Sequence, residues 1–374
     1  MTQALNPATV AAQTDTGLEG VVAAHTKLST VDGAAGELIL RGLRIEHMAG
    51  QMPFEAAVAH LWQDTVHLET GKDPDALRVA FGAARDSAVS ALPAMTAGSP
   101  ALSPFDRVQI GIAALALDDG LPDAVQITGA MPVLVAAAAR IGLGKEPIAP
   151  DPALGFADDL LRMVSGAPAP DWAVDALDRY LVTVLDHGLN ASTFAARVIA
   201  STRADMRDAV LGAMCALKGP LHGGAPGPVL DMLDAAGSPE NAAGWIDREL
   251  QAGRRIMGFG HRIYRTRDPR ADVLKAGVRT LPRSDRLILA EAVEKAALKA
   301  LRAAKPDRVL DTNVEFYTAI LLDGIGVDRA LFTPLFAAGR TAGWCAHVIE
   351  QQQTGKLIRP ASVYIGPDPA PSGT

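Results

Sequence analysis

Helical periodicity runs through most of this chain, and no regular alternation of strand and helix accompanies it. Proline-rich breaks at residues 92–103, 147–152 and 166–170 separate the helical runs, and each break is expected to be a loop. A parallel sheet would require strands that alternate with helices, so this pattern argues against one. The abundance of alanine and leucine agrees with a helical chain. We therefore predict an all-α fold.

One β-hairpin and two helices can be placed more closely. Residues 37–46 hold two short apolar runs around Arg41 and Gly42, which predicts a small hairpin near the N-terminus. Ser284 is a typical helix N-cap, and the apolar stripe that follows it stops before Pro306. A second helix is expected over about residues 329–352.

Arg340 falls on the apolar face of that second helix, four residues after Phe336 and four before Trp344. A guanidinium group aimed into a protein core is costly unless an anion meets it. Two interpretations remain open. Arg340 forms a structural ion pair with an internal Asp or Glu, or it binds the carboxylate of a ligand.

Residues 258–270 read GFGHRIYRTRDPR, and this segment has the character of an active-site loop. Its glycines allow the backbone to approach a bulky ligand closely. His261 can act as a donor or an acid near neutral pH, and Arg270 can hold a carboxylate through two parallel hydrogen bonds. The alternative interpretation is a basic surface turn.

Charge is unevenly distributed along the chain. The 35 basic and 42 acidic residues give a net charge of −7, which argues against a general affinity for nucleic acid. Basic residues nevertheless concentrate in one region, which predicts a specific anionic ligand, with a solvated arginine-rich face as the alternative. The arginines concerned are Arg254, Arg255, Arg262, Arg265, Arg267 and Arg270.

Two more histidines lie in glycine-containing turns. His222 stands in LKGPLHGGA, before a helix expected to begin near Pro226. The positive end of a helix dipole favours neutral imidazole, which suits a hydrogen bond to an enolate or thioester oxygen. An incidental turn histidine is the alternative. His187 stands in DHGLNAST and, taken alone, is interpreted as a structural histidine.

The sequence predicts neither a metal site nor a disulfide framework. Only Cys215 and Cys345 occur, and the histidines show no paired ligand spacing such as HExxH. The N-terminus has neither a secretion signal nor an arginine-rich transit peptide, and no run of about 18 apolar residues marks a membrane span. We expect a cytoplasmic protein with no membrane partner.

Seven collinear segments make this chain resemble the citrate synthase family, which includes 2-methylcitrate synthase. They are GLEGVV, DHGLNASTFAAR, LKGPLHGGA, GFGHRIYRTRDPR, NVEFYTA, GRTAGW and the terminal IRP. The resemblance extends from about Gly17 to Gly366, and the length looks like the family's short form.

The fold that this resemblance implies is almost wholly helical, with a small domain inserted in a larger one and a homodimeric assembly. On this sequence it implies a large domain of residues 18–222 plus 330–365 and a small domain of residues 223–329. Flexible ends are expected at residues 1–17 and 366–374.

The implied activity is the condensation of acetyl-CoA with oxaloacetate, followed by hydrolysis of citryl-CoA, without a metal or redox cofactor. His222 would stabilise the enolate oxygen, and His261 would polarise the ketone of oxaloacetate. The positions that match oxaloacetate-binding residues are His187, His261, Arg270, Arg340 and Arg359, of which Arg359 would reach the partner subunit's site. The positions that match backbone packed around CoA are Ile256, Met257, Gly258, Phe259 and Gly260.

The candidate base is Glu315, where the family usually has aspartate. Glutamate reaches about 1.5 Å further, and a misplacement of about 1 Å can cost roughly a hundredfold in rate. The two carboxyl groups differ in reference pKa by only about 0.4, so geometry matters more than basicity. We expect the surrounding backbone to accommodate the longer side chain.

Two other functions remain as alternatives. The chain could be a 2-methylcitrate synthase that uses propionyl-CoA, because one extra methyl group is worth only about 1–3 kcal/mol of discrimination. It could also be a non-catalytic homologue that binds CoA or a dicarboxylate, for which Glu315 is the only support in the sequence.

Overall fold

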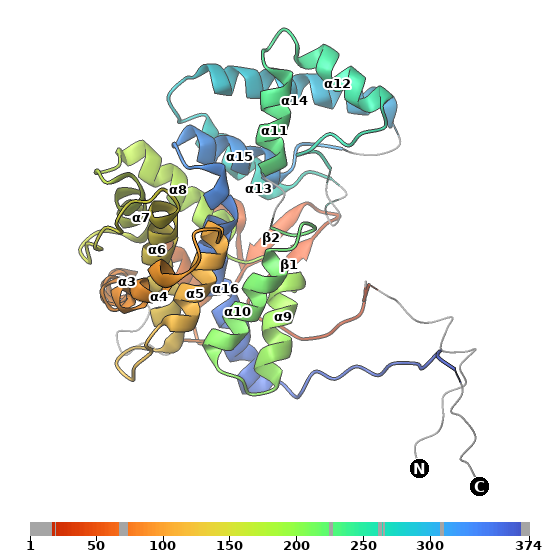
Figure 1. Cartoon of the computed structure of the whole chain (residues 1–374). Helices are drawn as coiled ribbons and strands as arrows, with labels where there is room; N and C mark the ends of the chain where they lie inside the picture. Colours follow the sequence, from red (N-terminus) through yellow and green to blue (C-terminus); the bar gives the residue numbers. More distant parts are fainter. Residues whose placement is uncertain are drawn as a thin grey trace.

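The computed structural model describes residues 17–18, 20–66, 74–223, 227–260, 264, 266–306 and 310–367. Within these ranges the chain is predominantly helical, which confirms the predicted fold class (Figure 1). The 3-10 helices are η1 (Ile45–His47), η2 (Val89–Ala91) and η3 (Arg329–Leu331). The α-helices are α2 (Phe54–Leu61), α3 (Pro74–Ala88), α4 (Leu92–Ala97), α5 (Pro104–Ala114), α6 (Asp123–Gly142), α7 (Phe156–Ser165), α8 (Asp171–Thr183), α9 (Ala191–Ser201), α10 (Met206–Leu217), α11 (Gly227–Ala236), α12 (Ala242–Gln251), α13 (Pro269–Val278), α14 (Asp285–Ala304), α15 (Val314–Gly324) and α16 (Phe332–Thr354). The ends predicted to be flexible fall mainly outside the described residues.

A small antiparallel sheet precedes the helices. Its strands are β1 (Ser29–Asp32), β2 (Glu37–Leu40) and β3 (Leu43–Arg44), in the order β1-β2-β3. The predicted hairpin is β2–β3. Its turn residues Arg41 and Gly42 have φ values of 47° and 87°, as a two-residue turn of this hand requires. Strand β1 was not predicted, because the sequence STVD has too few apolar residues to stand out.

Helix α6 lies at the centre of the hydrophobic core. Every residue from Ala124 to Ala139 is buried, which is typical of a helix enclosed by other helices. Helices α3, α5, α7 and α16 pack against it. By length and composition α6 could also span a membrane, but 83% of its apolar window is buried inside the protein. That burial identifies it as a core helix.

The two helices placed from sequence are present. Ser284 caps α14 by accepting a 3.2 Å hydrogen bond from the Leu287 amide, and η3 leads directly into α16. The loop predicted over residues 92–103 is wrong in its first half, which forms α4. Pro93 lies in the first turn of α4, where a missing N–H costs nothing.

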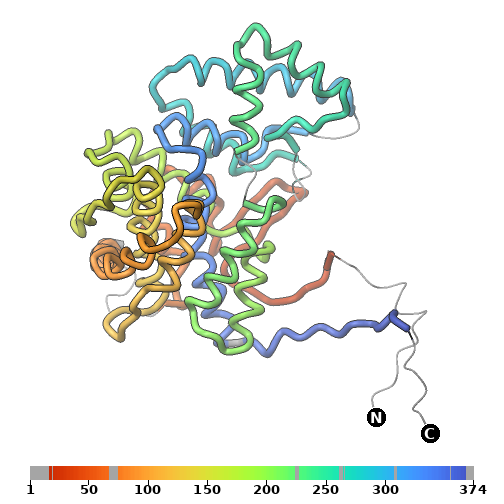
Figure 2. The backbone as a smooth tube through the Cα atoms, in the orientation of Figure 1, coloured from red at the N-terminus to blue at the C-terminus, as the bar shows by residue number. Residues whose placement is uncertain are grey.

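Helices α11 to α15 gather at one end of the molecule. The chain enters this group after α10 and returns through η3 to α16 (Figure 2). Helix α13 joins the group to the rest of the protein by packing against α8. There, Nη1 of Arg179 lies 3.4 Å from the Val273 carbonyl oxygen and 3.5 Å from that of Ala49. The predicted domain boundaries lie beside this group and remain a prediction.

Candidate active site

Five of the predicted site residues lie in the body of the protein, and four of these are at helix ends or in the turns between helices. Arg270 and Glu315 lie in the first turns of α13 and α15, and His187 lies between α8 and α9. His222 lies in the turn after α10, whereas Arg340 lies in the middle of α16. Their charges influence one another: Arg340 affects the pKa of His222, and Arg270 affects those of Arg340 and Glu315. The fold therefore brings Arg270, Glu315, His222 and Arg340 into one region, and His187 joins them through Tyr264, which contacts both His187 and Arg270.

The loop of residues 256–260 is fastened to the start of α15. The Gly260 amide donates to the Asp311 carbonyl at 2.8 Å, and the Asn313 amide donates to the Gly258 carbonyl at 3.0 Å. Gly258 has a φ of 84°, and a Cβ there would lie 2.9 Å from the side chain of Phe316. Glycine is thus required both by the backbone conformation and by the close approach of α15.

Arg270 is held by its neighbour Asp268. Its Nε and Nη2 each lie 3.0 Å from a different carboxylate oxygen of Asp268, in a bidentate ion pair. Burial lowers the pKa of Arg270, but the charges of Asp268, Tyr264 and Glu315 more than offset this and raise it overall. Asp268 also accepts a 3.3 Å hydrogen bond from the Val314 amide. Asp268 thereby links the start of α13 to the start of α15.

Glu315 presents a carboxylate to this buried region. Its Oε2 is buried and has no hydrogen-bond partner among the described residues. Burial raises the pKa of Glu315, Arg270 opposes that rise, and Asp268 adds to it. An unpaired carboxylate oxygen with a raised pKa is the combination that a general base requires.

Arg340 is only 1% exposed, as its place on the apolar face predicted. Its Nε donates to the Val184 carbonyl, and its guanidinium lies 4.9 Å from the ring centre of Phe336. Its terminal nitrogens have no hydrogen-bond partner among the described residues. Burial lowers the pKa of Arg340 to about 10, so the side chain stays cationic at neutral pH. Among the described residues Arg340 forms no ion pair with an Asp or Glu, and its role in binding a ligand remains a prediction.

Asp186 supplies the negative charge that most opposes the lowering of the Arg340 pKa. It is wholly buried, and its Oδ2 accepts hydrogen bonds from the Ser29 hydroxyl and from Nε2 of His347 at 3.3 Å. Burial raises the pKa of Asp186, but His347, Arg340 and Ser29 together lower it. His347 in turn receives a 3.0 Å hydrogen bond at Nδ1 from Arg197. Asp186 is therefore a buried, hydrogen-bonded anion whose charge acts on Arg340.

His222 is connected to α9. Its Nε2 lies 2.9 Å from the Ser192 hydroxyl oxygen, and its ring meets Phe336 edge to face. Burial, together with the positive charge of Arg340, lowers the pKa of His222 to about 4. A neutral imidazole was predicted, but from a helix dipole. His222 lies in a turn five residues before Gly227, so burial and Arg340 are the causes instead.

His187 is buried and contacts a residue that sequence reasoning missed. Its Nε2 lies 3.1 Å from the hydroxyl of Tyr264, and the two rings meet edge to face. The Arg270 guanidinium lies 5.7 Å from the ring centre of Tyr264. Tyr264 lies inside GFGHRIYRTRDPR, so the motif itself was the available signal. Ser192, Asp186 and Tyr180 were missed too.

The remaining predicted residues fall into two groups. His261, Arg262 and Arg265 lie outside the described residues, and the others lie on the surface. Arg359 is exposed on the extended segment that leaves the body after α16 (Figure 1). Two other arginines of the cluster form surface ion pairs, Arg254 with Glu249 and Arg267 with Asp272. Among the described arginines of the cluster, Arg254 and Arg267 are thus in surface ion pairs, and Arg270 is buried.

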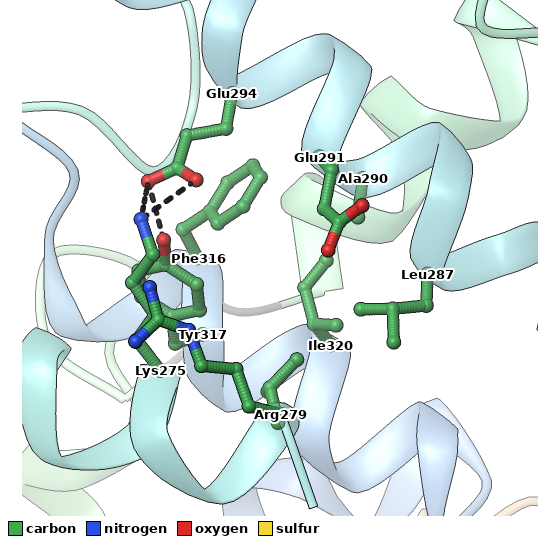
Figure 3. Close-up of a pocket in the computed structure, with 10 residues that line it drawn as sticks. Lys275, Arg279, Leu287, Ala290, Glu291, Glu294, Phe316, Tyr317 and Ile320 are labelled. Atoms are coloured by element: carbon green, nitrogen blue, oxygen red, sulfur yellow. Dashed lines mark hydrogen bonds and ion pairs between the residues drawn. The ribbon is translucent and has the colours of Figure 1, made fainter. Parts of the chain in front are cut away.

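A pocket of about 220 Å³ borders α13, α14 and α15 (Figure 3). Glu294 stands in it and accepts hydrogen bonds from Lys275 at 3.1 and 3.2 Å, from Thr312 at 2.8 Å and from the Tyr317 hydroxyl. These contacts tie the helix of Arg270 to the helix of Glu315. In the described residues, no group of three His, Cys, Asp or Glu side chains could hold a metal ion.

The chain is similar in sequence to known proteins over almost its full length. A family model described as citrate synthase, C-terminal domain, matches residues 17–361. Putative citrate synthase 2 of Mycobacterium tuberculosis (strain ATCC 25618 / H37Rv) is 38% identical over 363 residues, which covers 94% of this chain and 93% of the relative. A 2-methylcitrate synthase of Mycobacterium tuberculosis (strain ATCC 35801 / TMC 107 / Erdman) is 34% identical over 366 residues, covering 94% and 90%.

Solved structures are similar over nearly the same length. Citrate synthase from Thermotoga maritima MSB8 has a TM-score of 0.83 and 33% identity, covering 95% of this chain and 97% of that one. Citrate synthase from Thermoplasma acidophilum, in a ternary complex with carboxymethyl coenzyme A and oxaloacetate, has a TM-score of 0.81 and 26% identity, covering 97% of this chain and 98% of that one. With the fold, the motifs and these relatives in agreement over almost its full length, the chain belongs to the citrate synthase family of acyltransferases.

Proposed function

We propose that this protein condenses acetyl-CoA with oxaloacetate and hydrolyses the resulting citryl-CoA to citrate and CoA. The observation that carries this proposal is Glu315, whose buried Oε2 has no partner among the described residues, next to the buried cation Arg270. In the proposed reaction, Glu315 removes a proton from the acetyl methyl group of the thioester. Its raised pKa makes it a stronger base than an exposed glutamate.

His222 would stabilise the enolate oxygen of the thioester as a neutral donor. A pKa of about 4 keeps its imidazole uncharged at neutral pH. If the Ser192 hydroxyl donates to Nε2, the imidazole proton is on Nδ1 and can be donated to that oxygen. His261, by family resemblance, would polarise the oxaloacetate ketone.

Oxaloacetate would be held by Arg270, Arg340 and His187, with Arg359 of the partner subunit completing the site in a homodimer. Arg340 supports this role most directly, because a buried guanidinium with unpaired terminal nitrogens is costly until an anion binds. The loop of residues 256–260 would pack around CoA, and helices α11 to α15 would belong to the small domain that closes over both substrates. The CoA thioester is a substrate, and this acid–base mechanism needs no further cofactor.

The test is an assay of CoA release from acetyl-CoA plus oxaloacetate. The wild type should release CoA, and Glu315→Gln should lower kcat by on the order of 10²–10⁴ while oxaloacetate still binds in calorimetry. Glu291→Gln is the matched control, because Glu291 is a surface carboxylate paired with Arg283. Absence of CoA release by the wild type would overturn the proposal, as would full activity in Glu315→Gln.

The second candidate is 2-methylcitrate synthase, which is favoured by the 34% identical relative of that name. Comparison of kcat/KM for acetyl-CoA and propionyl-CoA decides between the two. A strong preference for propionyl-CoA would reject the first candidate. The measurement is needed because one methyl group is worth only about 1–3 kcal/mol of discrimination, so a pocket for one acyl group also admits the other.

A further inference from the structure

Trp344 makes a polar contact that its place in a hydrophobic stripe does not suggest. The side chain is fully buried in α16, and its Nε1–H donates a 3.1 Å hydrogen bond to the Ser192 hydroxyl oxygen on α9. The same oxygen lies 2.9 Å from Nε2 of His222. The indole is thus connected to the site histidine through one hydroxyl group.

The number of protons at Ser192 limits how this group can be bonded. A hydroxyl has one proton and two lone pairs, and an indole N–H can only donate, so Trp344 occupies one lone pair. The Ser192 proton then has two acceptors within reach, Oδ1 of Asn190 at 2.8 Å and Nε2 of His222. Oδ1 of Asn190 already accepts the two backbone amides of Ser192 and Thr193, each at 3.1 Å.

His222 therefore gains more from the Ser192 proton than Asn190 does. No other hydrogen bond reaches Nε2 of His222 from the described residues. Donation from Trp344 also polarises the Ser192 hydroxyl, which becomes a better donor and a poorer acceptor. Both effects favour a hydrogen bond that runs from Ser192 to Nε2 and leave the imidazole proton on Nδ1.

We propose that Trp344 is a positioning residue that acts through Ser192 to hold His222 as the neutral tautomer protonated at Nδ1. The catalytic value of that tautomer rests on the proposed function, whereas the tautomer itself can be observed without substrate. Trp344 touches neither substrate nor reacting atoms in this scheme. Its effect reaches the site only by orienting one hydroxyl proton.

The primary experiment is NMR of the full chain labelled with ¹⁵N-histidine, without substrate at neutral pH. The nitrogen shifts of an imidazole distinguish its two neutral tautomers, and His222→Gln assigns the signal among the eight histidines. The wild type should show His222 protonated at Nδ1. Trp344→Phe and Ser192→Ala should each move the signal towards the Nε2-protonated pattern or an average of the two.

The matched control is Trp62→Phe. Trp62 is also buried and also donates from Nε1 to α16, at 2.9 Å to the Ala342 carbonyl, but it has no link to His222. Trp344→Phe and Trp62→Phe each replace a buried indole, and each removes one hydrogen bond that involves a residue of α16. Only Trp344→Phe should change the His222 tautomer.

Kinetics supply the second readout. Trp344→Phe should lower kcat by on the order of tenfold with the KM for oxaloacetate unchanged, and it should have little further effect in a Ser192→Ala background. Trp62→Phe should leave kcat unchanged. The proposal is overturned if wild-type His222 is protonated at Nε2, if Trp344→Phe keeps the wild-type tautomer, or if Trp62→Phe alters it equally. The two proposals can fail separately. If NMR shows the expected tautomers but the protein releases no CoA, the proposed function is rejected and the inference about the tautomer stands.

Discussion

The side chain of Asn313 donates a 2.9 Å hydrogen bond from Nδ2 to the carbonyl oxygen of Gly260. Through its Oδ1 the same side chain caps α15, accepting from the Phe316 amide at 3.3 Å. Asn313 therefore fastens the loop proposed to pack around CoA to the helix that carries the proposed base. The position of the loop relative to the helix therefore depends on one residue, Asn313, that lies in neither of them.

Asn313→Ala should weaken both functions of this contact. Loss of an N-cap costs about 0.5–2 kcal/mol of unfolding free energy, and the released loop should raise the KM for acetyl-CoA several-fold. Urea unfolding and steady-state kinetics measure the two effects. Ser284→Ala is the control, because it removes the N-cap of α14 and leaves the loop intact. A similar rise in KM in both variants would contradict the special role of Asn313.

Glu315→Asp tests whether the site is built around glutamate. The shorter side chain withdraws the carboxylate by about 1.5 Å, and a displacement of about 1 Å can cost roughly a hundredfold in rate. We expect kcat to fall by about that factor while the affinity for oxaloacetate stays the same. Pre-steady-state measurement of CoA release and calorimetry provide the data. An aspartate variant as fast as the wild type would show that the backbone is not adapted to the longer residue.

His222→Gln should change how stability depends on pH. The folded pKa of His222, about 4, lies below its ordinary value of 6.5, so the fold favours the neutral form. The stability contributed by this group is therefore complete above about pH 6.5 and is lost as pH falls towards 4. Urea unfolding should show a steeper loss for the wild type than for His222→Gln between about pH 7 and pH 4.5. Parallel curves would rule out the depressed pKa.

Tyr180→Phe should stabilise the unliganded protein. The Tyr180 hydroxyl is buried without a hydrogen-bond partner among the described residues, and Arg340 and Glu315 both influence its pKa. An unsatisfied buried hydroxyl costs about 1–3 kcal/mol, so its removal should raise the unfolding free energy by on the order of 1 kcal/mol.

Tyr317→Phe is the control for Tyr180→Phe, because the Tyr317 hydroxyl has a hydrogen-bond partner and its loss should destabilise the protein. The Tyr317 hydroxyl donates to Glu294 in the cluster shown in Figure 3, so its removal should lower the unfolding free energy by about 1 kcal/mol. Thermal and urea unfolding of the two variants give the signs directly. A destabilised Tyr180→Phe variant would mean that its hydroxyl does have a partner.

Local patterns allowed much of the fold to be predicted. The caps and stripes of α14 and α16 depend on residues within a few turns of one another, and the β2–β3 turn depends on Arg41 and Gly42 alone. Strand β1 and helix α4 were not predicted. The first has too little apolar character, and the second holds in its first turn a proline, Pro93, that was interpreted as a break.

For the candidate site, the sequence by itself determined which residue types are available and where. His222, Arg270, Glu315 and Arg340 follow from motif and spacing, because a motif preserves the order of chemical groups along the chain. Only the tertiary structure decided what each group can do. The contact between Trp344 and Ser192 joins residues 152 positions apart, and the low pKa of His222 arises from burial and from Arg340 on α16. Desolvation and electrostatic interaction depend on distances in space, which sequence spacing does not contain.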